Sequence, residues 1–202
     1  NNTTFQTGNI LDPLPFDDHS FDLVNIRFIE GFVSKSKWPP LIDECVRITR
    51  PGGIIRITEA DNYGVTNSPA YQKITNFVLQ GQHRLGNAFS ADGHSSGLIP
   101  ACGSFLIKAG CTEIARKAHI LDFSTPMPLH DNYTKDVVIA FRLGAKVMSK
   151  LADLSEEEWI KLVDQMEIEM ISEDFCGVLI YVTTWGKVPA KPEQTDQQTT
   201  NA

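Results

Sequence analysis

The sequence predicts an α/β fold, in which strands and helices alternate along the chain. A buried apolar strand, a helix and a β-branched strand (residues 54–58) follow one another between Phe21 and Glu59, and the alternation continues to Trp185. A strand–helix–strand unit of this length predicts a right-handed crossover between parallel strands. The composition of the 202 residues, 42% hydrophobic and 21% charged, is ordinary for one globular domain.

The first unit can be delimited residue by residue. The apolar run 21–28 (FDLVNIRF) predicts a buried strand. Trp38–Pro40 predicts the start of a helix, since proline is tolerated in a first turn. Glu44 and Arg47, three residues apart on that helix, are expected to form a surface ion pair. Residues 50–53 (RPGG) then end the helix, because proline disfavours helix before it and glycine permits a reversal.

The remaining elements follow from capping residues and apolar periodicity. Ser68 is a typical N-cap followed by proline, and it predicts a helix to about Arg84. Ser155 and Glu158 form the capping-box pattern at the start of another helix. We expect helices over 98–109, 135–151 and 155–171, and strands over 112–123 and 176–185.

Charge and cysteine usage exclude several classes of function. The formal charge of −7 argues against non-specific binding to nucleic acids or anionic membranes. No run approaches the ~20 apolar residues of a membrane span, and the chain shows no signal-peptide pattern. We therefore expect a cytoplasmic protein. We also expect no metal site, because the four cysteines lack metal-binding spacing and are expected to be buried free thiols. These cysteines are Cys45, Cys102, Cys111 and Cys176.

Four motifs in order resemble those of small-molecule class I (Rossmann-like) S-adenosylmethionine-dependent methyltransferases. Residues 8–24, with GNI, LPF and SFDLV, are similar to the family's G-D-A, L-P-F and S-F-D-L-V. Residues 44–59 resemble its pattern E..R..KPGG…E. Residues 109–111 (AGC) stand where the family often has AGF, and residues 181–189 (YVTTWGKVP) resemble its closing TAWGRKP.

The resemblance implies a Rossmann-like sheet that contains strands three or four to seven, with the last strand antiparallel. Residues 1–189 would be the C-terminal portion of the domain, with helices inserted at about 66–97 and 130–172. The polar tail 190–202 is expected to be disordered. The family's G-x-G-x-G cofactor loop does not occur in the chain. We expect an upstream segment that carries it, because the strand 21–28 would otherwise be a bare sheet edge.

The resemblance also implies S-adenosylmethionine as cofactor, bound across the carboxyl ends of the parallel strands. Gly8, Asn9 and Ile10 stand where the family meets the adenine. The amide oxygen of Asn9 would replace the family's carboxylate as acceptor, and a turn-forming Gly–Asn pair is the alternative. A second set of three residues stands where the family binds the methionine part of the cofactor. Alternatively, its polar residues are there because the end of the strand is solvated. This second set is Asn25, Ile26 and Arg27.

Methyl transfer requires alignment of the reactants, and a base where the acceptor is an alcohol or amine. Glu59 ends the strand 54–58 and is the first candidate for this catalytic role. His94, in the loop sequence DGHSSG, is the second, with a solvated loop histidine as the alternative. The other side chains expected to face the acceptor substrate are Glu30, Asp61, Asn62 and Tyr63.

The sequence therefore supports methyl transfer from S-adenosylmethionine to an unidentified small organic acceptor, with the inserted helices as a lid. The alternative is a non-catalytic methyltransferase-like binding domain or an inactive fragment, which the missing glycine loop and Asn9 favour. A nicotinamide-dependent dehydrogenase shares the α/β pattern but requires the absent glycine fingerprint. The uncovered strand also favours association into a homodimer.

Overall fold

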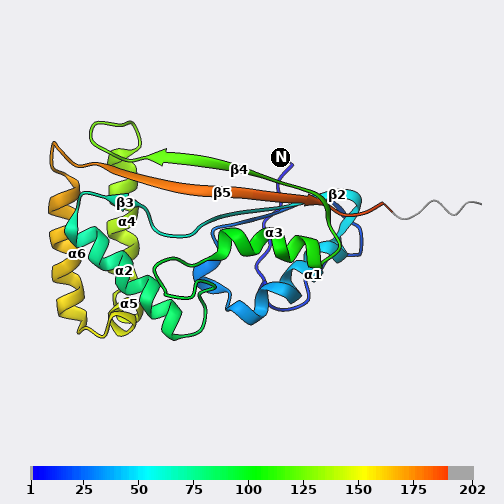
Figure 1. Cartoon of the computed structure of the whole chain (residues 1–202), viewed down its shortest axis with the longest axis horizontal. Helices are drawn as coiled ribbons and strands as arrows, with labels where there is room; N and C mark the ends of the chain where they lie inside the picture. Colours follow the sequence, from blue (N-terminus) through cyan, green and yellow to red (C-terminus); the bar gives the residue numbers. More distant parts are fainter. Residues whose placement is uncertain (1, 191–202) are drawn as a thin grey trace, which may run out of the picture.

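The computed structural model describes residues 2–190, which form a five-stranded sheet with helices at its face and at one end (Figure 1). The strands are β1 (Phe21–Arg27), β2 (Thr49–Ala60), β3 (Val65–Thr66), β4 (Thr112–Asp122) and β5 (Gly177–Lys187). The helices are α1 (Trp38–Ile48), α2 (Pro69–Arg84), α3 (Leu98–Lys108), α4 (His130–Leu143), α5 (Ala145–Ala152) and α6 (Glu156–Met170), with short 3-10 turns at Glu30–Phe32 and Lys35–Lys37. The predicted tail lies, from residue 191 on, outside the described residues.

The sheet confirms the predicted α/β class and the antiparallel last strand. Its order is β1-β2-β5-β3, and β4 pairs with β5. β1 and β2 are parallel, with Ile26 opposite Ile57, while β5 runs antiparallel to β2, β3 and β4. In the described part of the chain β1 pairs with β2 alone, so it forms an edge of the sheet.

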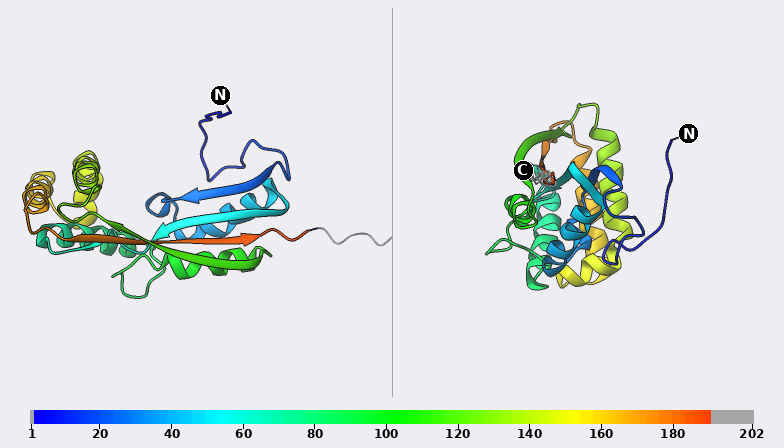
Figure 2. Two further views of the ribbon diagram at one scale, coloured as in Figure 1. Left: turned by 90° about the horizontal axis from the view of Figure 1, so that it is seen from above. Right: turned by 90° about the vertical axis from the view of Figure 1, so that its right-hand side faces the viewer.

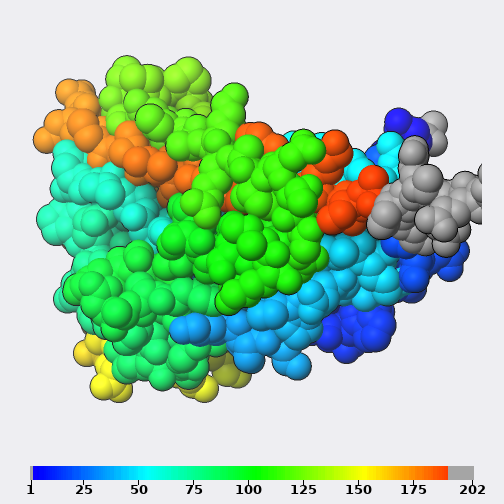
Figure 3. All heavy atoms as spheres, turned by 45° about the vertical axis from the view of Figure 1, so that its right-hand side comes forward, coloured from blue at the N-terminus to red at the C-terminus, as the bar shows by residue number. Residues whose placement is uncertain are grey.

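Helices α1 and α3 pack together on one face of the sheet. Ile55 and Ile57 of β2 are fully buried beneath them, as the alternation of a half-covered strand requires. The rings of Trp38 on α1 and Phe105 on α3 stack with centroids 6.0 Å apart. The space-filling view shows the two helices as one continuous surface (Figure 3). The opposite face carries a hollow of about 410 Å³ that is lined only by strand residues, among them Leu23 and Trp185.

The RPGG segment is not a turn outside the strand, as the sequence predicted, but part of β2. The strand begins at Thr49, and the pairing with β1 shifts register between Phe21 and Leu23. Gly52 adopts φ +80°, and its N–H donates to Val188 O at 2.8 Å. At Gly53, a Cβ would lie 2.7 Å from Thr49 Cγ2 and 3.0 Å from Asp22 O of β1, so β2 can approach β1 this closely only with glycine here.

The remaining helices, α2, α4, α5 and α6, form a helical lobe at one end of the long strands β4 and β5 (Figure 2). Its core contains the fully buried side chains of Trp159, Met166 and Phe123. The single helix predicted over 135–151 is instead two helices, and α4 begins earlier than expected, at His130. The break falls at Gly144, where the helix lacks a side chain that could pack and the chain changes direction.

The predicted caps of α2 and α6 are confirmed. Ser68 accepts a hydrogen bond from Tyr71 N and donates to Glu169 Oε2 at 2.6 Å, which ties α2 to α6. Ser155 and Glu158 form both bonds of a capping box. The structure thus adds to the Ser68 cap a contact between helices that no local pattern could predict.

The four cysteines are free, and three of them are buried as expected, whereas Cys176 is exposed. The prediction of four buried thiols is wrong for Cys176, because it lies in the short connection before β5. Among residues 2–190, no helix combines the length and the apolar character needed to cross a bilayer. The same residues contain no group of three or more metal-ligating side chains with suitable geometry.

Replacing Ser68 by alanine is expected to lower the free energy of unfolding by about 1–2 kcal/mol, because α2 loses its cap and its bond to α6. Urea unfolding monitored by circular dichroism measures the change. Ser104→Ala, on the exposed side of α3, is the matched control and should change stability by no more than about 0.5 kcal/mol. Equal effects of the two substitutions would contradict the role of Ser68.

Candidate functional site

A group of acidic side chains lies at the carboxyl ends of β1 and β2. Glu30 follows β1, whereas Glu59 is near the end of β2 and Asp61 directly follows it. Because parallel strands end at the same edge of a sheet, the fold brings the three carboxyl groups together. Charge repulsion from Glu59 and Asp61 acts on Glu30 across this edge. The sequence predicted all three for this place.

Glu59 is the most deeply buried of the three, with 1% of its surface exposed. Its Oε1 accepts a hydrogen bond from Ile29 N at 2.9 Å, and the backbone N–H of Glu30 also donates to this carboxyl group. Burial raises the pKa of Glu59 to about 7, although these two hydrogen bonds oppose the shift. The side chain predicted as the catalytic base therefore holds the turn that follows β1.

Glu30 is half-buried and opens the 3-10 turn at Glu30–Phe32. Burial raises the pKa of Glu30 to about 7, with repulsion from Glu59 and Asp61 adding to the shift and the Ser96 hydroxyl opposing it. A carboxyl group with a pKa near neutrality can both hold and release a proton at physiological pH.

Asp61 connects the strand end to α3. Its Oδ1 accepts from Ser96 Oγ at 3.0 Å and from Ile99 N at 2.9 Å, in the first turn of α3. A carboxylate in this position satisfies a free helix N–H and matches the helix dipole. Ser96 was not predicted, and its position in a polar loop gave no signal that it would meet Asp61.

Tyr63 and Asn62 complete this edge of the site. Burial raises the pKa of Tyr63 well above its usual value, and the charges of Glu30 and Glu59 add to the shift. The carbonyl of Tyr63 accepts a hydrogen bond from Tyr71 of α2, so Tyr63 joins the site to the helical lobe. Asn62 Oδ1 accepts from Gly64 N at 3.0 Å, which is a local turn contact.

The second catalytic candidate, His94, is exposed. Its backbone N–H donates to Asp92 Oδ1 at 3.0 Å, while its ring makes no hydrogen bond within residues 2–190. This is the alternative described above, a solvated histidine in a loop, and the structure does not join it to the carboxyl cluster.

The predicted adenine contacts Gly8, Asn9 and Ile10 lie on an exposed segment beside α1. Asn9 Oδ1 accepts from Leu11 N at 3.1 Å and its Nδ2 donates to Asp12 Oδ2 at 3.1 Å, so its side chain forms a turn. The turn that was the alternative explanation of Gly–Asn is therefore present. One lone pair of the Asn9 oxygen remains available to a ligand.

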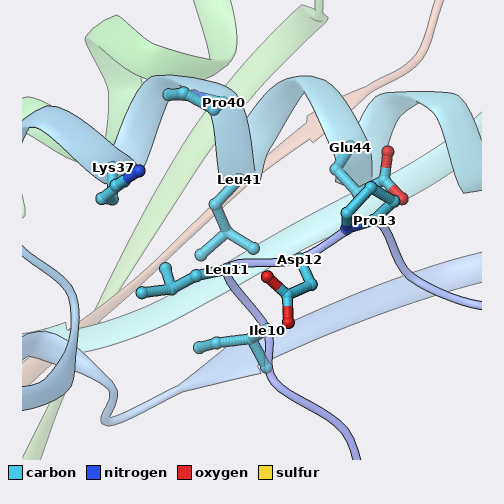
Figure 4. A pocket seen from close by; sticks show the side chains of 8 residues that line it. All are labelled: Ile10, Leu11, Asp12, Pro13, Lys37, Pro40, Leu41 and Glu44. Carbon is cyan, nitrogen blue, oxygen red and sulfur yellow. The ribbon is translucent and has the colours of Figure 1, made fainter.

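A hollow of about 190 Å³ lies between this segment and α1 (Figure 4). In the close-up, Ile10 and Leu11 lie opposite Leu41 of α1, and the carboxylate of Asp12 lies beside them. Of these residues only Ile10 was predicted as a ligand contact, because Leu41 follows the apolar period of α1 and was assigned to the core. The other residues that line the hollow are Pro13, Lys37, Pro40 and Glu44.

An ion-pair network fixes the segment on which the hollow depends. Glu44 accepts from Leu14 N at 2.7 Å, and Arg47 donates to Phe16 O at 2.8 Å and to Asp18 Oδ1 at 2.7 Å. The Arg47 guanidinium and the Leu14 N–H lower the pKa of Glu44 to about 2. The predicted ion pair of Glu44 and Arg47 is present, and it also binds residues 14–18 to α1.

The residues at the end of β1 divide between the two faces of the sheet. Ile26 is buried under α1 and α3. Asn25 is exposed and accepts from Arg56 Nε at 2.8 Å, while the Arg27 guanidinium lies 4.9 Å from the centroid of the Phe28 ring. These contacts agree with the alternative that the strand end is solvated.

Residues 1–57 match the model of a family described as a methyltransferase domain. The match contains the first of the four motifs described above and most of the second, and it supports the resemblance to methyltransferases there. No curated protein matches the chain significantly.

Several solved structures are similar to the chain at low identity. Phosphoethanolamine N-methyltransferase 2 of Haemonchus contortus, solved with phosphomonomethylethanolamine and S-adenosylhomocysteine, is 15% identical, with 86% of this chain and 34% of that protein covered at a TM-score of 0.40. The YcgJ protein of Bacillus subtilis is 12% identical, with 95% of this chain and 73% of that protein covered at a TM-score of 0.47. The [4+2]-cyclase SpnF is 17% identical, with 93% of this chain and 57% of that protein covered at a TM-score of 0.45. The chain thus spans about a third of the length of the Haemonchus enzyme.

The raised carboxyl pKa values predict that stability falls as the pH rises. Between about pH 4.5, the ordinary pKa, and about pH 7, the folded protein keeps the proton of Glu59 while the unfolded chain releases it. The free energy of unfolding therefore falls as the pH rises through this range, and it does not fall further above it. Glu59→Gln removes this effect and should raise the free energy of unfolding at pH 8 by at most about 3 kcal/mol.

Urea unfolding at pH 5, 6, 7 and 8 measures this dependence. Glu173→Gln, at an exposed position outside the site, should keep the slope of the native protein. A Glu59→Gln protein with the native slope would show that Glu59 does not bind a proton at these pH values.

Proposed function

We propose that the protein transfers a methyl group from S-adenosylmethionine to a small organic acceptor. The observation that carries the proposal is the match of residues 1–57 to a methyltransferase domain. The grouping of acidic side chains at the carboxyl ends of parallel strands supports it, because ligands of open α/β sheets bind at this edge. When bound, the cofactor supplies an electrophilic methyl group on its sulfonium.

The hollow beside α1 fits the adenine of this cofactor. Its walls are apolar at Ile10, Leu11 and Leu41, and the Asp12 carboxylate offers an acceptor for an exocyclic amine. Gly8, Asn9 and Ile10 form one side of this proposed subsite. The methionine part is assigned to the end of β1, where the residues are Asn25, Ile26 and Arg27.

The acceptor is assigned to the edge formed by Glu30, Asn62 and Tyr63. The carboxyl cluster, with Glu59 at its centre, supplies the group that receives the acceptor's proton. Tyr63 is bonded to α2, and we assign to the helical lobe the role of limiting the size of the acceptor. His94 remains the second candidate for the base.

The competing proposal is a non-catalytic binding domain of the same fold. The turn made by the Asn9 side chain favours it. Both readings predict a cofactor-sized ligand, and only methyl transfer to an acceptor distinguishes them. We further propose a cytoplasmic protein without nucleic-acid or membrane partners, and a homodimer that covers the edge of β1.

Calorimetric titration of the intact protein with S-adenosylhomocysteine tests the cofactor assignment. We expect binding, and we expect Ile10→Ser to weaken it about 3–10-fold, because one apolar wall of the hollow is lost. Phe5→Ser is the matched control, since Phe5 is 93% exposed and lies outside the hollow. No heat at millimolar ligand would contradict the proposed function.

Transfer of a radioactive methyl group to a panel of small amines, alcohols and acids then tests catalysis. At saturating cofactor, His94→Gln should retain at least about half of the native rate, because the exposed ring is not joined to the cluster. A loss of about 100-fold would instead make His94 the base.

A further inference from the structure

We propose that Glu59 is a positioning residue whose carboxylate clamps the turn after β1, and that Glu30 is the carboxyl group presented to the acceptor. This division of roles rests on the proposed methyl transfer. It reassigns the base from Glu59, near the end of β2, to Glu30, at the start of the 3-10 turn after β1.

The hydrogen bonds of Glu59 leave it little freedom to reach a substrate. Its carboxyl group receives the backbone N–H groups of Ile29 and Glu30, and 1% of the residue is exposed. A general base must come within hydrogen-bond reach of the proton it accepts, about 2.6–3.2 Å. A carboxyl group covered by its own backbone partners does not meet this condition.

The backbone of the turn explains why a clamp is needed. Phe28, between β1 and Ile29, has φ +53°, a left-handed conformation that costs a bulky residue on the order of 1 kcal/mol or more. Phe28 N donates to Thr58 O at 3.1 Å, and Ile29 N donates to the side chain of the next residue in β2, Glu59. Two successive bonds to β2 thus hold the chain through its sharpest bend.

The other carboxyl group of the cluster is also committed to structure. Asp61 Oδ1 accepts from Ser96 Oγ and from Ile99 N in the first turn of α3. Among the three acids, Glu30 alone lacks a backbone donor among the described residues, and it is half-buried where Glu59 is fully buried. Glu30 is therefore the carboxyl group that combines partial exposure with freedom from backbone donors, since its one partner within residues 2–190 is the Ser96 hydroxyl.

The groups that face Glu30 come from several elements. Glu59 belongs to β2, Asp61 and Tyr63 to the segment after it, and Ser96 to the loop before α3. Burial is the main cause of the raised pKa of Glu30, the two neighbouring carboxyl groups add to it, and the Ser96 hydroxyl opposes it. No arginine, lysine or histidine among the described residues forms an ion pair with this cluster.

The proposed chemical step is balanced. A lone pair of an amine nitrogen or hydroxyl oxygen forms a bond to the methyl carbon, while the pair of the carbon–sulfur bond returns to sulfur. The acceptor's proton passes to the Glu30 carboxylate. Since the proton is later released to water, the carboxyl group must ionise near neutral pH, as its surroundings favour.

Kinetics of three variants test the division of roles. Glu30→Gln should lower kcat at least about 100-fold and leave the affinity for S-adenosylhomocysteine unchanged. Glu59→Ala should lower kcat by a similar factor, whereas Glu59→Gln should fall by less than about 10-fold, because its amide oxygen still accepts the Ile29 N–H. If Glu59→Gln is as inactive as Glu59→Ala while Glu30→Gln is active, Glu59 is the base and the proposal is wrong.

The pH dependence of kcat distinguishes the proposal from a structural defect, which would not shift its apparent pKa. The native acid limb of kcat should have an apparent pKa near 7, the value of Glu30. Glu59→Gln removes a negative charge beside Glu30 and should shift this limb to lower pH. Glu173→Gln, the exposed control, should leave it in place, and an unmoved limb in Glu59→Gln would contradict the coupling.

Amide hydrogen exchange tests the clamp without reference to activity. Exchange at Ile29 should be at least about 10-fold faster in Glu59→Ala than in the native protein, and near native in Glu59→Gln. Equal exchange in all three proteins would overturn the clamp. If Ile29 exchanges as expected in all three proteins but the native protein transfers methyl to no acceptor, the proposed function is wrong and the structural role of Glu59 is still supported.

Discussion

The parallel pairing of β1 with β2 is the constraint on which the site depends. It sets Ile26 opposite Ile57 and Arg27 opposite Thr58, so that the two chains leave the sheet at the same edge. Everything polar that follows these strands is therefore gathered at one place, although Glu30 and Glu59 are distant in the sequence. A slip of the register by one residue would turn Glu59 from the face under the helices to the opposite face.

The antiparallel strand β5 determines what surrounds that edge. It pairs with β2 on one side and with β4 on the other, and both long strands continue to the helical lobe. The lobe reaches the site through Tyr63, whose carbonyl is bonded to Tyr71. Helix α2, inserted after β2, is thereby tied to the segment that follows Glu59, while the buried residues of the lobe form a core of their own.

Sequence patterns predicted what local interactions determine. The cap at Ser68, the capping box at Ser155 and the order of strands and helices all follow from neighbours a few residues apart. The extension of β2 through RPGG, the break at Gly144 and the contact of Asp61 with Ser96 depend on partners distant in sequence. Glu30 and Glu59 were predicted at the site, but which of them is covered by backbone donors is a property of the folded turn.

The turn after β1 destabilises the fold in three ways. It holds Phe28 at φ +53°, it buries the carboxyl group of Glu59, and it sets a second acidic side chain beside the first. A glycine at position 28 and an amide at position 59 would relieve much of this cost without altering the strand pairing. Strain and buried charge that a simple substitution could remove are most often retained where they serve a function. The energetic cost of this turn therefore supports our proposal that the chemistry takes place at the edge formed by β1 and β2, and it does so independently of any hollow on the surface.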